Sequence, residues 1–141
     1  MTPEQEALVQ ASFAKVAPIA EPAAEIFYQR LFALDPNLRA LFAEDMTEQR
    51  RKLMAMLGSA VANLNQWASV APLVRAMGLR HRGYGVRLAD YDTVGAALIA
   101  TLETGLGDAF TEPVRQAWFA CYALVAGEMI AGAEPPNMTA A

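Results

Sequence analysis

The sequence predicts an all-α protein, and three observations support this fold class. Apolar residues recur at spacings of three and four along most of the chain, as on the buried face of a helix. Residues that start and stop helices separate these segments. The period-two alternation and hairpin dipeptides that indicate strands are absent from the sequence. We therefore expect about six to eight helices and no sheet.

The first two helices are predicted from their boundary residues. Thr2 and Gln5 have the spacing of a capping box, with Pro3 at the first helical position. The second helix is expected to begin at Glu21 or at the proline that follows it. It should end before Pro36, because proline disfavours helical geometry in the residue that precedes it. A short turn over residues 36–45 then follows.

Two further helices are predicted in the middle of the chain. Thr47 is expected to cap a helix over residues 48–64. The next helix is expected from Trp67 to near Gly83, either as one continuous helix or with a break along its length.

Two more helices and a tail complete the prediction. Asp90 is expected to cap a helix that ends at Gly105 or Gly107, and Thr111 to cap a last helix over residues 112–132. Residues 133–141 should form a disordered tail.

Composition excludes several classes of function. The chain has 141 residues, of which 55% are hydrophobic and 18% charged, so a single globular domain is expected. This apolar share suggests that some of the surface covers a bound apolar object or forms a subunit interface, and we expect a monomer or a weak homodimer. The net charge of −4 and the pI near 4.9 argue against nucleic acid and against an anionic membrane as partners.

The single cysteine, Cys121, indicates a reducing compartment, because no intramolecular disulfide can form. The N-terminal segment lacks the pattern of a secretory signal. No apolar run approaches the roughly 20 residues that span a bilayer. These features predict a cytoplasmic protein.

The only histidine, His81, lies on an apolar stripe. Val74 and Met77 precede it by seven and four residues, with Leu73 expected alongside, so the imidazole should face inward. It could be an ordinary core histidine bonded to a carbonyl, or a metal ligand. A structural zinc site needs about four ligands, and a chain with a single histidine and a single cysteine does not supply them. Haem iron needs only one axial base and an apolar slot, because the porphyrin supplies four nitrogens.

The helix predicted over residues 48–64 could form the wall opposite His81. Gln49, Leu53 and Met56 fall on one helical face, which combines an amide with two apolar groups. Tyr28, in the segment IFYQRLF, could add a phenol from the side. Each residue also has an ordinary interpretation, with Tyr28 as a packing residue and Gln49 as a solvated one. Together they could donate hydrogen bonds to a ligand on iron.

The order of these segments resembles the globin family over roughly residues 3–132. FYQRLFALDPNLRALF is similar to the second globin helix, its short proline-started helix and the phenylalanine of the next corner, Phe42. QRRKLM resembles the distal helix and GLRHRGYGV the proximal one, and residues 91–129 resemble the last two helices and their connector. The match is closest to bacterial single-domain globins related to flavohaemoglobins, with a neuroglobin-like proximal segment. It implies a three-on-three helical sandwich around haem b, as one domain over residues 1–141.

The resemblance also implies a set of site residues. His81 would ligate the iron, and Tyr28 and Gln49 would form the distal pair. The crevice around the haem would be lined by Phe42, Leu53, Met77, Val86, Tyr91, Val94 and Leu98. Lys52, Arg80 and Arg82 could reach the propionates, whereas Trp118 and Tyr122 are expected in the core.

Two features depart from the related families. No second histidine stands at the distal position, so bis-histidine coordination is not available. Tyr91 matches a proximal tyrosine of flavohaemoglobin-type globins, but Ala133 stands where their glutamate belongs, with Glu134 beside it. The increase in basicity that such a carboxylate gives the histidine is not expected here.

The resemblance implies reversible binding of O₂, CO and NO at a pentacoordinate iron ligated by His81, with Tyr28 and Gln49 stabilising the bound ligand. An enzymatic alternative is nitric oxide dioxygenation to nitrate. This reaction would need a separate reductase, because a flavin or nicotinamide domain does not fit within 141 residues. A third alternative is a helical interaction module without haem, similar to the haemless sensor globins of some bacteria.

Overall fold

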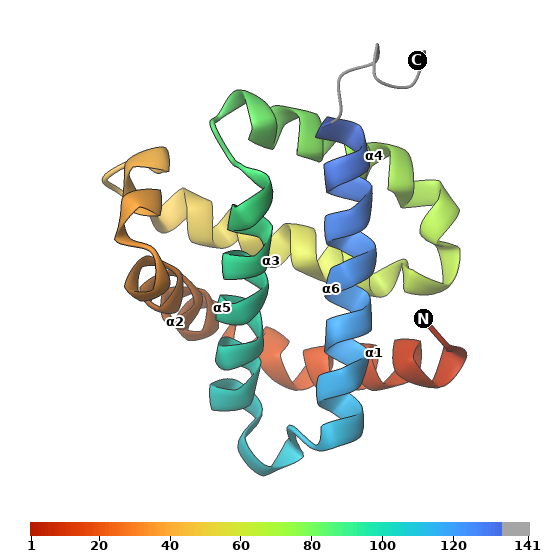
Figure 1. Ribbon diagram of the computed structural model, residues 1–141. Coiled ribbons are helices and arrows are strands. Elements are labelled where there is room, and N and C mark those ends of the chain that lie inside the picture. The colour runs from red at the N-terminus through yellow and green to blue at the C-terminus, as the bar shows by residue number, and fades with distance from the viewer. Residues whose placement is uncertain (134–141) are drawn as a thin grey trace.

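The computed structural model describes residues 1–133, which form six α-helices and no strand, so the all-α prediction is confirmed (Figure 1). The helices are α1 (Pro3–Val16), α2 (Ala20–Leu34), α3 (Thr47–Ala62), α4 (Trp67–Gly83), α5 (Leu88–Leu106) and α6 (Glu112–Ala133). Short 3-10 turns lie between several of them, and η2 (Pro36–Leu41) follows α2. The predicted tail, including Glu134 but not Ala133, lies outside the described residues.

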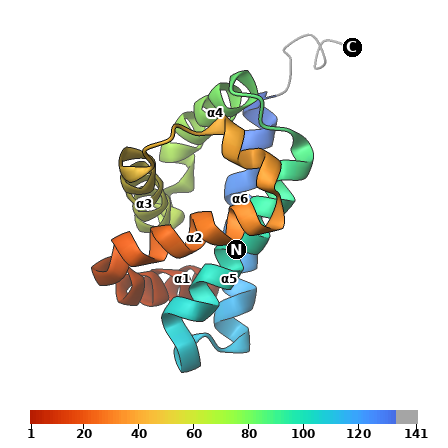
Figure 2. The same cartoon turned by 90° about the vertical axis from the view of Figure 1, so that its left-hand side faces the viewer.

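The helices form two crossed layers of three. In Figure 1, α5 and α6 run side by side, and α1, α3 and α4 cross behind them. The remaining helix, α2, packs against α5; it is seen nearly end-on at the left of Figure 1 and lengthwise in Figure 2. This is the predicted three-on-three sandwich. Within residues 1–133, none of the helices combines the length and the apolarity needed to cross a membrane.

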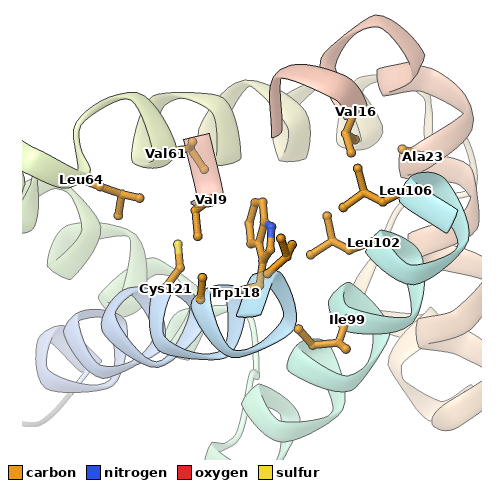
Figure 3. Packing of buried hydrophobic residues seen from close by; sticks show 12 residues of the cluster. Val9, Val16, Ala23, Val61, Leu64, Ile99, Leu102, Leu106, Trp118 and Cys121 are labelled. Carbon is orange, nitrogen blue, oxygen red and sulfur yellow. The ribbon is translucent and has the colours of Figure 1, made fainter. Parts of the chain in front are cut away.

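Trp118, the largest side chain of the core, connects α6 to α1 through packing and a hydrogen bond. It is fully buried on α6, among aliphatic side chains from α1, α3 and α5 (Figure 3). Its indole N–H donates to the Ser12 hydroxyl at 2.8 Å, and that hydroxyl donates to the Leu8 carbonyl at 2.7 Å. A buried donor left without a partner is costly, so this bond favours one packing of α1 on α6.

Two glycines allow α4 and α6 to cross closely. A Cβ atom at Gly78 would lie 1.8 Å from the Met129 carbonyl oxygen, and one at Gly132 would lie 2.0 Å from the Arg75 carbonyl oxygen. Only glycine leaves room for backbone contact at these positions. The crossing fixes the helix that carries His81 one turn after Gly78.

Helix starts were predicted with mixed success. The capping box of α1 is confirmed: the Thr2 hydroxyl accepts the Gln5 N–H at 3.1 Å, and the Gln5 amide oxygen accepts the Thr2 N–H at 3.0 Å. The prediction for Thr47 was wrong, because this residue is the first of α3 and its own N–H is accepted by Asp45 at 2.9 Å.

Two predictions around His81 also need correction. Asp90 does not cap α5; it is the third residue of that helix and reaches back to accept the Arg87 N–H at 2.8 Å. A carboxylate in the first turn can satisfy a free N–H just as one at the cap can. Leu73 does not line the inward stripe of α4 but is 66% exposed, because eight residues place it about 80° around the helix from His81. The helix itself is continuous through Pro72.

Candidate functional site

One cavity of about 650 Å³ is enclosed by α2, η2, α3, α4, α5 and α6. The structure brings all twelve predicted site residues to its walls: Tyr28, Phe42, Gln49, Lys52, Leu53, Met77, Arg80, His81, Val86, Tyr91, Val94 and Leu98. Pockets of about 300–1,000 Å³ with apolar walls and a few polar groups are typical ligand sites. Because all twelve residues line the same cavity, the structure supports their prediction as one group. The role of each residue is still a prediction.

His81 lies in the last turn of α4, and its ring is oriented by its own helix. Its Nδ1 atom lies 2.7 Å from the Met77 carbonyl oxygen. A carbonyl only accepts hydrogen bonds, so Nδ1 carries the hydrogen, and Nε2 is the nitrogen that bears the lone pair in the neutral tautomer. His81 is thus a carbonyl-bonded histidine, as in the first interpretation from the sequence, and it also lies on a cavity wall; its role as a metal ligand stays a prediction. A neutral imidazole with one free nitrogen is the form that ligates a metal.

The chain folds back on His81 directly after α4. The His81 carbonyl accepts the N–H groups of Tyr84 at 3.1 Å and Val86 at 3.0 Å. Gly85 between them has a φ of 97°, a left-handed conformation that favours glycine. This turn returns the chain towards the cavity, so that Val86 forms part of the wall.

Tyr28 and Gln49 meet on another side of the cavity. The Gln49 side-chain amide donates to the Tyr28 hydroxyl at 3.2 Å. Tyr28 is 6% exposed and packs edge-on against Phe27 and Phe42. Burial raises the pKa of Tyr28, an effect that the Gln49 bond reduces but does not cancel, so the phenol stays protonated. Because its oxygen accepts from Gln49, its own hydrogen is free to be donated to another group.

The rim of the cavity carries positive charge. Lys52 and Arg80 are both exposed at its edge, and among the described residues neither forms an ion pair. Arg82 differs: it does not line the cavity, and its guanidinium donates to the Ala133 carbonyl at 3.1 Å. Two cations are therefore available for an anionic group at the opening.

The family model for globins matches residues 25–129, well over half of the chain. The protein belongs to the globin family. Curated relatives include the neuroglobins of the fishes Dissostichus mawsoni and Chaenocephalus aceratus, at 28% and 27% identity; in both comparisons the match covers 94% of this chain and 92% of the relative.

Solved structures of bacterial and fungal globins have the same fold. An engineered carbene transferase, derived from a protein of Rhodothermus marinus that is named as a nitric oxide dioxygenase, superposes with a TM-score of 0.84 at 26% identity. That match covers 99% of this globin and 96% of the other chain. A bacterial globin from Campylobacter jejuni gives a TM-score of 0.84 at 22% identity, covering 94% and 96%. A flavohaemoglobin from Malassezia yamatoensis, with bound FAD and haem, gives 0.78 at 21%, covering 94% of this chain and 36% of that one.

Membership of the globin family implies a haem, and the residues of this globin fit one. The cavity offers one histidine with a free ring nitrogen, apolar walls and two cations at the opening. An axial base, an apolar slot and partners for the propionates are what a haem requires from its protein. The donor set therefore agrees with the cofactor.

Other cavity residues of this globin were not predicted as site residues. Several come from η2 and α6: Leu38, Leu41, Trp118, Cys121, Tyr122, Val125, Ala126 and Met129. Trp118 and Tyr122 were expected in the core; both line the cavity, and Trp118 also belongs to the buried core. Those on α6 recur at spacings of three and four, so helical periodicity could have identified this face. Burial raises the pKa of Cys121 to about 12, so the thiol on this wall is neutral.

Asp90 and Tyr84 were also missed as parts of the cavity wall. Asp90 is 3% exposed and was interpreted only as a helix cap. Tyr84 follows α4 and is 65% exposed. No periodicity marks either residue, because both belong to the turn and helix start that follow His81.

Proposed function

We propose that this globin holds haem b in the cavity and reversibly binds O₂, CO and NO, with His81 as the ligand of a pentacoordinate iron. One observation carries the proposal. A histidine with a free Nε2 on α4 shares a cavity with a hydrogen-bonded tyrosine–glutamine pair on α2 and α3. The proposal extends to residues 1–141 as one globin domain.

Each residue has a role in this proposal. The haem supplies an iron centre with a coordination position for a gas. His81 Nε2 would hold that centre from α4, and the Met77 carbonyl, which accepts from Nδ1, fixes the orientation of the ring. The Tyr28 hydroxyl would donate to the bound gas, with Gln49 orienting the phenol and Leu53 limiting the space.

The walls supply most of the affinity for the cofactor. Phe42, Met77, Val94 and Leu98 are apolar and line the same cavity, with Val86 and Tyr91 beside them. Burying several hundred Å² of apolar surface contributes on the order of 10 kcal/mol before the costs of binding, at about 25 cal/mol per Å². We assign Lys52 and Arg80 at the rim to the propionates, whose charge they complement.

An absorption spectrum tests the proposal directly. We expect the purified protein, reduced and then exposed to CO, to show an intense Soret band that shifts when CO binds. His81→Ala should lose the haem or change its spectrum, because the axial base is removed. A protein without a Soret band, or an alanine variant with an unchanged spectrum, would contradict the assignment of His81.

Nitric oxide dioxygenation is the second candidate. It is supported by the likeness to the Rhodothermus marinus protein, at 26% identity over nearly the whole chain. O₂ and NO would combine to nitrate in the cavity, and a separate reductase would have to return the iron to the ferrous state. Sustained nitrate formation with such a reductase supports the enzyme, whereas a single stoichiometric turnover supports gas binding alone.

The setting we propose is the cytoplasm, which suits a protein whose one cysteine is a buried free thiol. We propose a monomer or a weak homodimer. Sedimentation of the haem-loaded protein over a range of concentrations measures this, and a stable higher oligomer would contradict it.

A further inference from the structure

The turn that follows His81 is fastened at its far end by a charged pair. Arg87 precedes α5 in an extended conformation, and Asp90 lies in the first turn of that helix. One Asp90 oxygen accepts the Arg87 backbone N–H at 2.8 Å, and the other lies 3.0 Å from the Arg87 guanidinium. The pair therefore joins backbone and side chain at the same point.

Asp90 is an unusual residue for a cavity wall. Its side chain is 4% exposed, whereas that of Arg87 is 68% exposed. A buried carboxylate without a partner is costly, so the guanidinium compensates a charge that faces the interior. The pair differs in this respect from an ordinary surface ion pair, which contributes little.

A third charge connects this pair to the segment that follows α2. The Arg87 guanidinium lies 3.8 Å from Asp35, which ends α2. The other Asp35 oxygen accepts the Asn37 N–H at 3.1 Å and so starts η2. Leu38 and Leu41 of η2 line the cavity, and a Cβ at Gly85 would lie 3.6 Å from Leu41. The turn after His81 and the segment after α2 are thus held together.

The backbone carries this restraint to the histidine. Val86, next to Arg87, donates its N–H to the His81 carbonyl at 3.0 Å. Tyr91, next to Asp90, lines the cavity like Val86. A movement of the Arg87–Asp90 pair would therefore shift residues on both sides of it that face the cofactor site.

We propose that Arg87 and Asp90, joined to Asp35, are positioning residues that set the placement of His81 and of the turn behind it. This inference rests on the proposed function, because it concerns the ligand of the haem iron. It assigns no contact with the cofactor to Arg87. The triad acts through Val86 and the His81 backbone.

Four variants test the triad: Arg87→Met, Arg87→Lys, Asp90→Asn and Asp35→Asn. The readouts are the iron–histidine stretching band of the ferrous protein and the rate of haem transfer to excess apomyoglobin. We expect Arg87→Met and Asp90→Asn to shift or broaden the band and to transfer haem about tenfold faster, the lower end of the range for lost outer-shell support of a metal ligand, because the triad acts on His81 only through the backbone. Asp35→Asn should have a smaller effect in the same direction, and Arg87→Lys should recover part of the loss.

The chain provides a matched control. Arg51 and Glu48 on α3 form an ion pair with the same three-residue spacing, and the Arg51 side chain is 65% exposed. Arg51→Met should leave the stretching band and the haem transfer rate unchanged. Folded Arg87→Met and Asp90→Asn proteins that behave like Arg51→Met would overturn the proposal. If these two variants do not fold, unchanged readouts in Arg87→Lys and Asp35→Asn overturn it equally.

A measurement on the haem-free protein separates this inference from the proposed function. Hydrogen exchange of the Val86 amide reports the turn directly. We expect faster exchange in Arg87→Met than in Arg51→Met, and equal rates would overturn the positioning role. A wild-type protein without a histidine-ligated haem spectrum would instead contradict the proposed function, whatever the exchange result.

Discussion

Tyr28 carries a buried hydroxyl group whose hydrogen is not used in the bond with Gln49. Gln49 donates to its oxygen, which leaves the phenol hydrogen for a ligand in the cavity. Gln49 therefore acts largely through Tyr28, and the two residues should contribute unequally to gas retention. The raised pKa of Tyr28 keeps this donor protonated at neutral pH.

We accordingly expect Tyr28→Phe to raise the O₂ dissociation rate more than Gln49→Leu does. A hydrogen bond to a charged acceptor is worth about 1.5–3 kcal/mol, or roughly tenfold to a hundredfold in rate. Stopped-flow replacement of O₂ by CO measures both variants. Unchanged rates in both would remove the distal pair from the mechanism, and a larger effect of Gln49→Leu would assign the main donor to the amide.

Asp90 should make the stability of the protein depend on pH in the acid range. Burial raises the pKa of Asp90. The Arg87 N–H and guanidinium together lower this pKa by more than burial raises it, so the value in the folded protein lies below the ordinary 3.8. Such a group adds stability that is fully present above the ordinary pKa and is lost as the pH falls through the folded pKa. The free energy of unfolding of the wild type should therefore exceed that of Asp90→Asn by a constant amount near neutral pH.

That difference should decrease below pH 3.8, the ordinary pKa of the carboxyl group. Urea unfolding of both proteins at a series of pH values measures it. A difference that grows towards acid pH would show that the pKa of Asp90 is raised, not lowered, in the folded protein.

At the scale of elements, the crossing of α4 and α6 determines where His81 stands. Gly78→Ala would place a methyl group 1.8 Å from the Met129 carbonyl oxygen, so the helices must separate. We expect a loss of stability of about 1–3 kcal/mol, typical of an overfilled core, together with faster haem loss. Urea unfolding and haem transfer measure the two effects.

Gly127, also on α6, is the control for this substitution. A Cβ there would meet nothing within 4 Å, so Gly127→Ala should stabilise the helix by about 0.5–1 kcal/mol. Equal effects of the two substitutions would show that the close crossing does not limit the packing.

The sequence predicts elements well where the signal is local. The capping box of Thr2 and Gln5 is confirmed because both partners lie within one turn. Thr47 and Asp90 were assigned wrongly because a polar side chain near a helix start can serve at the cap or inside the first turn, and spacing does not distinguish these registers. Leu73 was misplaced because its angular offset from His81 carries it off the buried stripe.

At the scale of the molecule, the twelve predicted residues line one cavity because helical periodicity identifies buried faces and the globin-like order of segments says which faces meet. The triad of Asp35, Arg87 and Asp90 had no such signal. Its members belong to a helix end and a helix start that are distant in sequence, and only the fold brings them together.

The cavity takes part of its wall from the same helices as the core, so haem binding should stabilise the whole molecule. Binding to the folded state alone adds RT ln(1 + [L]/Kd), about 2.7 kcal/mol at a concentration 100-fold above Kd. We expect the haem-free protein to unfold at a lower temperature, and added haem to restore the midpoint in a concentration-dependent way. Two leucine variants separate this coupling from ordinary core packing.

Leu102 is 2% exposed in the core and does not line the cavity, whereas Leu53 does. Leu102→Ala should lower the stability of the haem-free and haem-loaded proteins by similar amounts, about 2–5 kcal/mol for a buried leucine. Leu53→Ala should mainly reduce the gain on adding haem, because it removes wall surface from the bound cofactor. Calorimetric scans of both variants with and without haem measure these differences. A gain on adding haem that Leu53→Ala leaves intact would show that the cofactor does not bind against this wall.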